Sequence, residues 1–263
     1  PLAGVLFVME EMRNQFNYSF TNFKMVVICC VMATIVLHLI IGSQPAIQME
    51  VFELPTLGSL WLFFVFGILM GLAGLLFNVT LMRTVGWLDK QNPKNKKYYI
   101  LAVGFLVGYL AYSYPATVGG GYVIISEALT MSPAFSVLCS LIVIRFIMTM
   151  LSYSSGVPGG IFAPMLALGT LFGLGFFHLF QWLSMDFSIE PGMFAVAGMG
   201  ALFAAAVRSP ITGVVLVVEM TKNSSLILPL MVSCITATIV VQLARNEPIY
   251  TQLLERTLRL NAK

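Results

Sequence analysis

Long apolar runs separated by short polar stretches dominate the chain. Two of these runs, residues 23–42 and 56–83, are long enough to cross a bilayer as helices, and the longer one must tilt or extend beyond the hydrocarbon. Further apolar segments cover residues 98–114, 133–153, 161–183, 191–207, 210–221 and 224–244. The last stretch, 249–260, carries Glu255, Arg256 and Arg259, and predicts an amphipathic helix at the membrane interface or in the cytoplasm.

Several of these segments have the wrong length for simple spans. Residues 210–221 are too few to cross alone, residues 191–207 begin at a proline, and SSGVPGGIFAP at 154–164 interrupts a long apolar block. Broken helices are tolerated in a membrane only where their backbone is buried in protein or lines a wet cavity. This pattern predicts an all-α membrane protein, with the tilted and half-spanning helices of transporters built from inverted repeats.

Composition excludes an ordinary soluble domain. The chain is 59% hydrophobic and 10% charged, whereas soluble domains carry about 25% charged residues. No Ser/His constellation, no Cys/His metal spacing and no phosphate-binding GxxxxGK occurs, so we expect no enzyme, no metal and no cofactor. The net charge of +3 gives no indication of a nucleic-acid partner. Because the sequence begins with Pro inside an apolar run, we expect an N-terminal part to be missing.

Basic residues predict which side of the membrane each loop occupies. The loop 84–97 holds Lys90, Lys94, Lys96 and Lys97, whereas the loop 43–55 holds no Lys or Arg. We therefore expect 84–97 in the cytoplasm and 43–55 outside. The end of the first segment, near Glu10 and Glu11, then also faces the cytoplasm.

One short motif occurs twice. PLAGVLFVMEEM at 1–12 matches PITGVVLVVEMT at 210–221 with an offset of 209. In this alignment Pro1 matches Pro210, Gly4 matches Gly213 and Glu10 matches Glu219. The match suggests an internal duplication of a larger unit. Glutamates placed alike by such a duplication are most simply structural, through helix capping, hydrogen bonds between helices or contact with water at the headgroups.

Glu11 has no counterpart in the second copy, where Met220 stands. Neighbouring helical residues point about 100° apart, so Glu10 and Glu11 cannot face the same cavity. An unmatched carboxylate at the inner end of a membrane helix is a candidate for proton transfer. The alternative is a solvated glutamate at a helix end.

The glycine-rich break predicts an anion site. Gly156, Gly159 and Gly160 allow positive φ and a close approach of the backbone to a ligand, and Pro158 stops any preceding helix. The helix that begins after the break has N–H groups without internal partners, and we expect the amides of Ile161 and Phe162 to be the anion donors. The alternative is a glycine hinge that only allows tight packing. Arg145, the one charge within 133–153, is interpreted as a structural residue paired with a carboxylate or carbonyls.

These motifs together resemble one family. SSGVPGGIFAP, the opening PLAG…EEMR, the block AGMGALFAAAVRSPITGVVLVVEMT and the late Pro-Ile-Tyr250 are similar to the CLC chloride channels and chloride/proton antiporters, above all the bacterial ones. The resemblance implies the end of a first inverted repeat in 1–42 and a second repeat in 55–263, together one transmembrane domain over 1–263. It implies chloride between the amides of Ile161 and Phe162 and the hydroxyl of Tyr250, with Glu11 as the internal proton-transfer residue. The family's GSGIP and GREGP motifs, which supply a serine and the external gating glutamate, do not occur in this chain.

The resemblance leads to a proton-coupled chloride antiporter as the first hypothesis. In this hypothesis the chain is part of a longer homodimeric protein in the bacterial inner membrane, which exchanges chloride for protons. The expected dimer interface is formed by 1–12, 23–42, 210–221 and 224–242. A passive chloride channel is the second hypothesis, against which Glu11 argues because channels usually have an apolar residue there. A third, of another class, is a structural fragment that packs or dimerises without transporting ions.

Overall fold

The computed structural model describes residues 1–11, 19–49, 52–53, 55–122, 124–126, 133–182 and 189–261. Within these ranges the regular structure is helical throughout, as predicted. The helices are α1 (Leu2–Glu11), α2 (Phe20–Ile41), α3 (Leu60–Asp89), α4 (Pro93–Ser113), α6 (Phe135–Ser154), α7 (Phe162–Trp182), α8 (Pro191–Val207), α9 (Pro210–Thr221), α10 (Ile227–Leu243) and α11 (Ile249–Asn261). Short 3₁₀ turns cover Leu57–Ser59, Pro115–Thr117 and Ser224–Leu226.

Prolines define the two half-length helices. α8 begins at Pro191 and α9 at Pro210, at the positions predicted from the sequence. Proline is favoured in the first turn because the N–H that it lacks would have no partner there. Arg208 adopts φ of 63° after α8, in the left-handed conformation that ends a helix. The chain therefore turns at Arg208 between two short helices that pack against each other.

Within the described ranges, five helical segments are long and apolar enough to span a membrane. They are Phe20–Ile41, Leu57–Asp89, Phe135–Ser154, Phe162–Gln181 and Ser224–Leu243. The predicted apolar segment 98–114 forms α4, but this helix starts earlier, at Pro93, and includes Lys94, Lys96 and Lys97. These lysines lower its mean hydropathy, so α4 does not count among the five.

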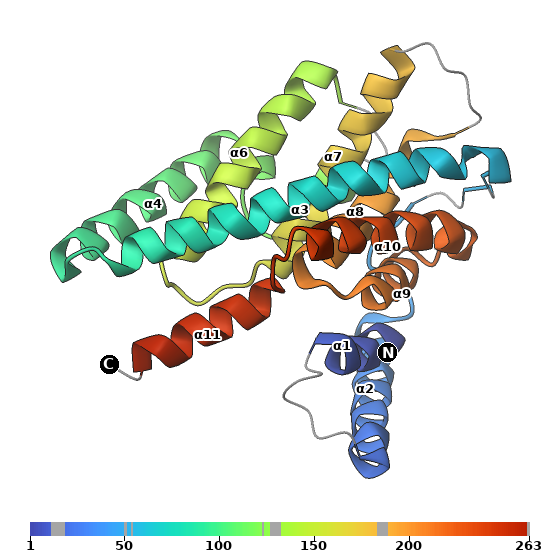
Figure 1. Ribbon diagram of the computed structural model, residues 1–263, viewed down its shortest axis with the longest axis horizontal. Coiled ribbons are helices and arrows are strands. Elements are labelled where there is room, and N and C mark those ends of the chain that lie inside the picture. Colours follow the sequence, from blue (N-terminus) through green and yellow to red (C-terminus); the bar gives the residue numbers. More distant parts are fainter. Residues whose placement is uncertain are drawn as a thin grey trace.

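α8 forms the centre of the bundle. Each of its residues from Gly192 to Val207 is buried, and it packs against α3, α7, α9 and α10. In Figure 1, α3 crosses the bundle lengthwise, with α6 and α7 extending away from it on one side. A helix that is apolar on every face belongs inside a large assembly rather than at its surface.

Glycines allow α7 and α8 to approach closely. A Cβ on Gly173 would lie 2.0 Å from the carbonyl oxygen of Phe194, and a Cβ on Gly169 would lie 2.3 Å from that of Gly198. Both contacts are with backbone, which cannot move aside as a side chain can. Small residues at such crossings are the usual means of close helix packing in membranes.

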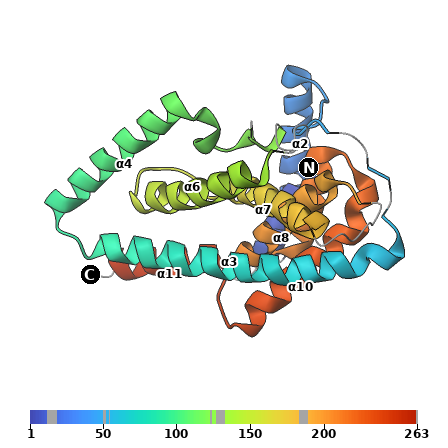
Figure 2. The same ribbon diagram turned by 90° about the horizontal axis from the view of Figure 1, so that it is seen from above.

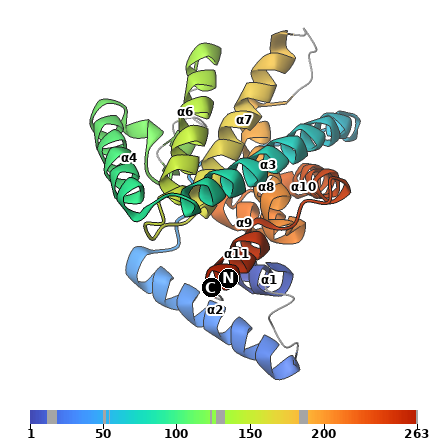
Figure 3. The ribbon, with the colours of Figure 1, turned by 60° about the vertical axis from the view of Figure 1, so that its left-hand side comes forward.

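α2 lies apart from the bundle. None of its residues is buried, although its mean hydropathy is 2.5. Figure 3 shows it as a long helix running past the bundle near α1. Its apolar surface must therefore face lipid or another protein surface.

Candidate ion-transport site

The glycine-rich break leads directly into α7, which begins at Phe162. The first internal hydrogen bond of this helix runs from Met165 N to Ile161 O, 3.0 Å long. The amides of Ile161, Phe162 and Ala163 therefore have no acceptor inside the helix, and the positive end of its dipole lies there. The predicted donors have the geometry of a helix N-terminus.

Only one of the three glycines of the break adopts the positive φ angle that was expected of them. Gly156 has φ of +75°, whereas Gly159 and Gly160 are not among the positive-φ residues. A Cβ on Gly160 would meet nothing within 4 Å. Conformational freedom thus explains Gly156, while Gly159 and Gly160 leave the backbone of the break without covering side chains.

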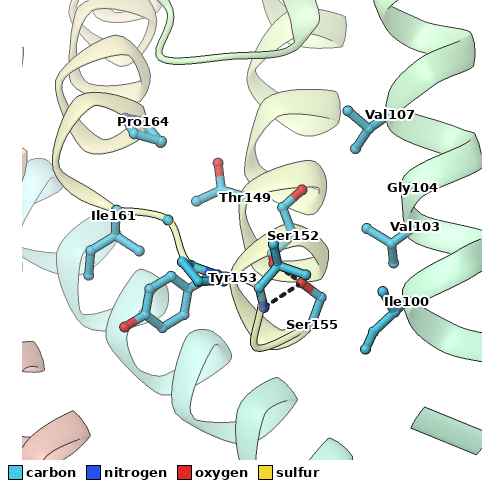
Figure 4. A pocket seen from close by; sticks show the side chains of 14 residues that line it. Ile100, Val103, Gly104, Val107, Thr149, Ser152, Tyr153, Ser155, Ile161 and Pro164 are labelled. Carbon is cyan, nitrogen blue, oxygen red and sulfur yellow. Dashed lines mark hydrogen bonds between the residues drawn. The ribbon is translucent and has the colours of Figure 1, made fainter. Parts of the chain in front are cut away.

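Two neighbouring cavities border the break. The first, of about 360 Å³, is lined by Gly159, Gly160 and Ile161 together with residues of α4 and α6. Figure 4 shows Val103 and Val107 of α4 on one side of it and Ile161 and Pro164 on the other, with the hydroxyl residues of α6 between them. The second, of about 530 Å³, shares Gly160 with the first and also borders Phe162. The start of α7 therefore lies beside open space.

Arg145 lines the second cavity. Its guanidinium donates hydrogen bonds to the carbonyls of Val118 and Gly119 at 3.2 and 3.0 Å. A Cβ on Gly121 would lie 2.6 Å from this guanidinium, so glycine is required for the loop to pass it. The interpretation of Arg145 as a structural residue bonded to carbonyls is supported by these contacts.

A series of aromatic rings connects Phe162 with Tyr250. Phe162 packs against Phe203 of α8 at 5.4 Å between ring centroids. Phe203 in turn packs against Phe7 of α1 at 6.4 Å, and Phe7 meets Tyr250 edge-on at 6.2 Å. The fold thus brings α7, α8, α1 and α11 together around the predicted anion site. Sequence reasoning missed Phe7 and Phe203, because aromatic residues in apolar helices are most often ordinary core residues.

Tyr250 lies in the first turn of α11 and is partly buried. Burial raises the pKa of its hydroxyl to about 12, and the nearby Glu11 carboxylate and Tyr153 add to the rise. Tyr250 therefore remains a neutral O–H that can donate to a ligand.

Glu11 ends α1, outside the five candidate spans. Burial raises the pKa of its carboxyl to about 7, the Ser209 hydroxyl opposes the rise, and the charge of Glu10 adds to it. Ser209 is itself fully buried, and its Oγ has no hydrogen bond of good geometry in the described part of the chain. A carboxyl in this environment gains and loses a proton near neutral pH.

Glu10 and Glu219 are structural, as the sequence repeat indicated. The Glu10 carboxylate accepts hydrogen bonds from the amides of Ile211 and Thr212 at 3.2 and 2.7 Å. The Glu219 carboxylate accepts from those of Leu2 and Ala3 at 2.9 and 3.0 Å. Each glutamate therefore caps the N-terminus of the helix that carries the other, and both oxygens of each carboxylate accept a hydrogen bond there.

The described residues contain no group of His, Cys, Asp and Glu that could hold a metal ion. The polar groups near the break are hydroxyls, backbone amides and single carboxylates. Such groups suit the binding of a small anion and the movement of a proton.

Comparison with known proteins gives a consistent assignment. The sequence model of the voltage-gated chloride channel family matches residues 1–242. The chain is 46% identical to the H⁺/Cl⁻ exchange transporter ClcA of Vibrio parahaemolyticus, over 98% of this chain and 56% of that protein. The chain thus spans little more than half the length of this curated relative.

Comparison with solved structures leads to the same family as the sequence comparisons. A slow cyanobacterial Cl⁻/H⁺ antiporter superposes with a TM-score of 0.94 at 38% identity, covering 100% of this chain and 62% of that one. A eukaryotic CLC transporter superposes with a TM-score of 0.77 at 25% identity, covering 96% and 42%. The all-α fold with broken helices, the match over most of the chain and the close relatives together show that this chain belongs to the CLC family of voltage-gated chloride channels and chloride/proton exchangers.

Proposed function

We propose that the protein containing this chain exchanges chloride for protons across a membrane. The observation that carries the proposal is that the Glu11 carboxylate lies close enough to Tyr250 to raise the pKa of its hydroxyl, and that Tyr250 is linked through Phe7 and Phe203 to the start of α7. A proton-accepting group and a set of anion donors therefore share one neighbourhood. A relative that is 46% identical is an H⁺/Cl⁻ exchange transporter.

Chloride would bind at the start of α7. The amides of Ile161 and Phe162 and the Tyr250 hydroxyl supply donors without a fixed positive charge, and the break at Gly156, Gly159 and Gly160 leaves them accessible. A site built from backbone dipoles holds an anion weakly enough to release it, which transport requires. The role of these residues follows from the helix geometry and from the family resemblance.

Glu11 would exchange protons with the cytoplasm. Its neighbours Glu10 and Glu219 are occupied as helix caps, so Glu11 is the carboxylate of this region that remains for proton transfer. Its pKa of about 7 suits repeated protonation at physiological pH.

The repeat boundaries and the dimer are also proposals. We assign 1–42 to the end of a first inverted repeat and 55–263 to a second, which the antiparallel capping of α1 and α9 supports. We assign the dimer interface to 1–12, 23–42, 210–221 and 224–242, of which residue 12 lies outside the described residues. An apolar groove of about 340 Å³ formed by α1, α9 and α10 and the exposed apolar surface of α2 are the supporting features.

The five apolar spans indicate an integral membrane protein. We propose the bacterial inner membrane as its location, because the relative that is 46% identical comes from a bacterium. A passive chloride channel remains the second candidate, favoured only if Glu11 does not exchange protons.

The test uses the full-length protein in liposomes with an imposed chloride gradient and external pH as the readout. We expect protons to move uphill, driven by chloride. Chloride flux without proton movement would make the protein a channel, and no flux of either ion would reject both functions. This chain reconstituted alone should move no chloride, since residues outside it complete the site in the family.

A further inference from the structure

α11 holds Tyr250 at the candidate site, yet few of its residues are buried. Only Ile249 and Leu253 are fully buried among the described residues of this helix. Figure 1 shows α11 extending from the bundle beside the C-terminal half of α3, and Figure 2 shows the same pairing from above. The position of Tyr250 therefore depends strongly on how α3 holds α11.

The first attachment lies where α10 turns into α11. The buried Asn78 of α3 donates from Nδ2 to the Ala206 carbonyl and to Oδ1 of Asn246, both at 3.0 Å. Gln252 Nε2 donates to the same Asn246 oxygen at 3.3 Å. These bonds fix the connection, in which Arg245 adopts φ of 53°.

The second attachment is an ion pair farther along both helices. Arg256 of α11 donates from Nε and Nη2 to the two oxygens of Asp89, the last residue of α3, both at 2.6 Å. The two side chains are 32% and 23% exposed, whereas the Arg259–Glu255 pair within α11 is 78% and 45% exposed. Bidentate, partly buried pairs of this kind fix geometry, while exposed pairs contribute little.

Helix geometry connects this ion pair to the site. Arg256 follows Tyr250 by six residues, which is about 9 Å along a rigid helix. The ion pair holds α11 to α3 at Arg256, and the hydrogen bonds of Asn246 hold the chain just before α11 begins. Without the ion pair, α11 would be free to pivot about the Asn246 connection. Tyr250, four residues beyond Asn246, would then move with the helix relative to Phe7.

We propose that Asp89 and Arg256 form a clamp between α3 and α11 that positions the Tyr250 hydroxyl for anion binding and so sets the chloride affinity of the site. The two residues touch no anion themselves and act through α11. The inference rests on the proposed function of Tyr250 as a chloride donor. It assigns a function-determining role to a pair of charges that lie outside the glycine-rich break.

The test measures chloride affinity by calorimetry and the chloride-to-proton ratio in liposomes, using the full-length protein. Arg256→Gln and Asp89→Asn should each weaken chloride binding about tenfold, which corresponds to ~1.4 kcal/mol, and should loosen coupling. The double variant should lose no more than either single variant, because both break one interaction. In a Tyr250→Ala background, Arg256→Gln should cause no further loss of affinity.

Glu255→Gln with Arg259→Gln is the matched control, because it removes the other ion pair of the same helix. This control should leave chloride affinity and coupling unchanged. A lower melting temperature for Arg256→Gln with wild-type chloride affinity would overturn the proposal and leave the pair a purely stabilising one. An additional loss in the Tyr250→Ala background would overturn it as well. If the wild-type protein itself neither binds nor exchanges chloride, the proposed function fails first, and this outcome is distinguishable from failure of the clamp.

Discussion

Glu10 and Glu219 cap each other's helices. Glu10 binds the amides of Ile211 and Thr212, and Glu219 binds those of Leu2 and Ala3. The same offset of 209 that aligns the two glutamates also aligns these two pairs of amides. Since each helix ends at the other's beginning, α1 and α9 run antiparallel, related by an approximate two-fold axis. Glu11 breaks this symmetry, because Met220 occupies the corresponding place.

The reciprocal caps predict a cooperative loss of stability. Glu10→Gln and Glu219→Gln each replace a charged acceptor of two backbone amides at a helix N-terminus, and each should destabilise the fold by about 1–3 kcal/mol. The two losses should not add, because both caps join the same pair of helices. Thermal unfolding in detergent measures this. Glu11→Gln is the control and should leave the melting temperature nearly unchanged; equal losses in all three variants would contradict the assignment.

The α7–α8 crossing predicts which glycines are indispensable. Gly173→Ala would force a methyl group to within 2.0 Å of the Phe194 carbonyl oxygen, whereas a Cβ on Gly175 has ordinary contacts at 3.8 Å. Overpacking of this kind costs about 1–3 kcal/mol or more, so Gly173→Ala should unfold at a clearly lower temperature. Gly175→Ala, on the same helix, should tolerate the change or gain slightly from its better helix propensity. A Gly173→Ala protein as stable as wild type would mean that the two helices separate easily.

Local signals explain why much of the fold could be predicted. Pro191 and Pro210 mark the starts of α8 and α9, and the lengths of the apolar runs indicate where the spans lie. The boundary of α4 was missed because Pro93 and the lysines that follow it look like a polar loop, although a helix can begin there. The repeated motif indicated structural roles for Glu10 and Glu219, but it could not name the amides that they cap.

Long-range contacts of the site could not be read from the sequence. Nothing in the local pattern of α3 or α11 indicates that Asp89 meets Arg256, because 167 residues separate them. The approach of Phe7 to Tyr250 likewise depends on how α1 packs against α8. Such pairings follow from the packing of whole helices. A charged residue at the end of an apolar run, such as Asp89, is the one signal that could have prompted a search for a partner.

Glu11 predicts a specific pH dependence. With a pKa raised to about 7 by burial, its carboxyl is mostly protonated below pH 7 and mostly ionised above it. Chloride-driven proton movement should therefore change most steeply near an internal pH of 7. Glu11→Gln should abolish proton movement while chloride flux continues, and Glu11→Asp should retain part of the coupling. Proton pumping against a gradient by Glu11→Gln would exclude this role.

Tyr250 predicts separate contributions from its hydroxyl and its ring. Tyr250→Phe removes the donor but keeps the edge-on contact with Phe7, so chloride binding should weaken by about twofold to thirteenfold, corresponding to the ~0.5–1.5 kcal/mol of one hydrogen bond. Tyr250→Ala also removes the ring, so it should weaken binding further and loosen the ratio of chloride to proton. Calorimetric chloride titration of the two full-length variants compares these effects, with Tyr153→Phe as a control for a nearby hydroxyl. Wild-type affinity in Tyr250→Ala would remove this residue from the anion site and leave the backbone amides at the start of α7 as its donors.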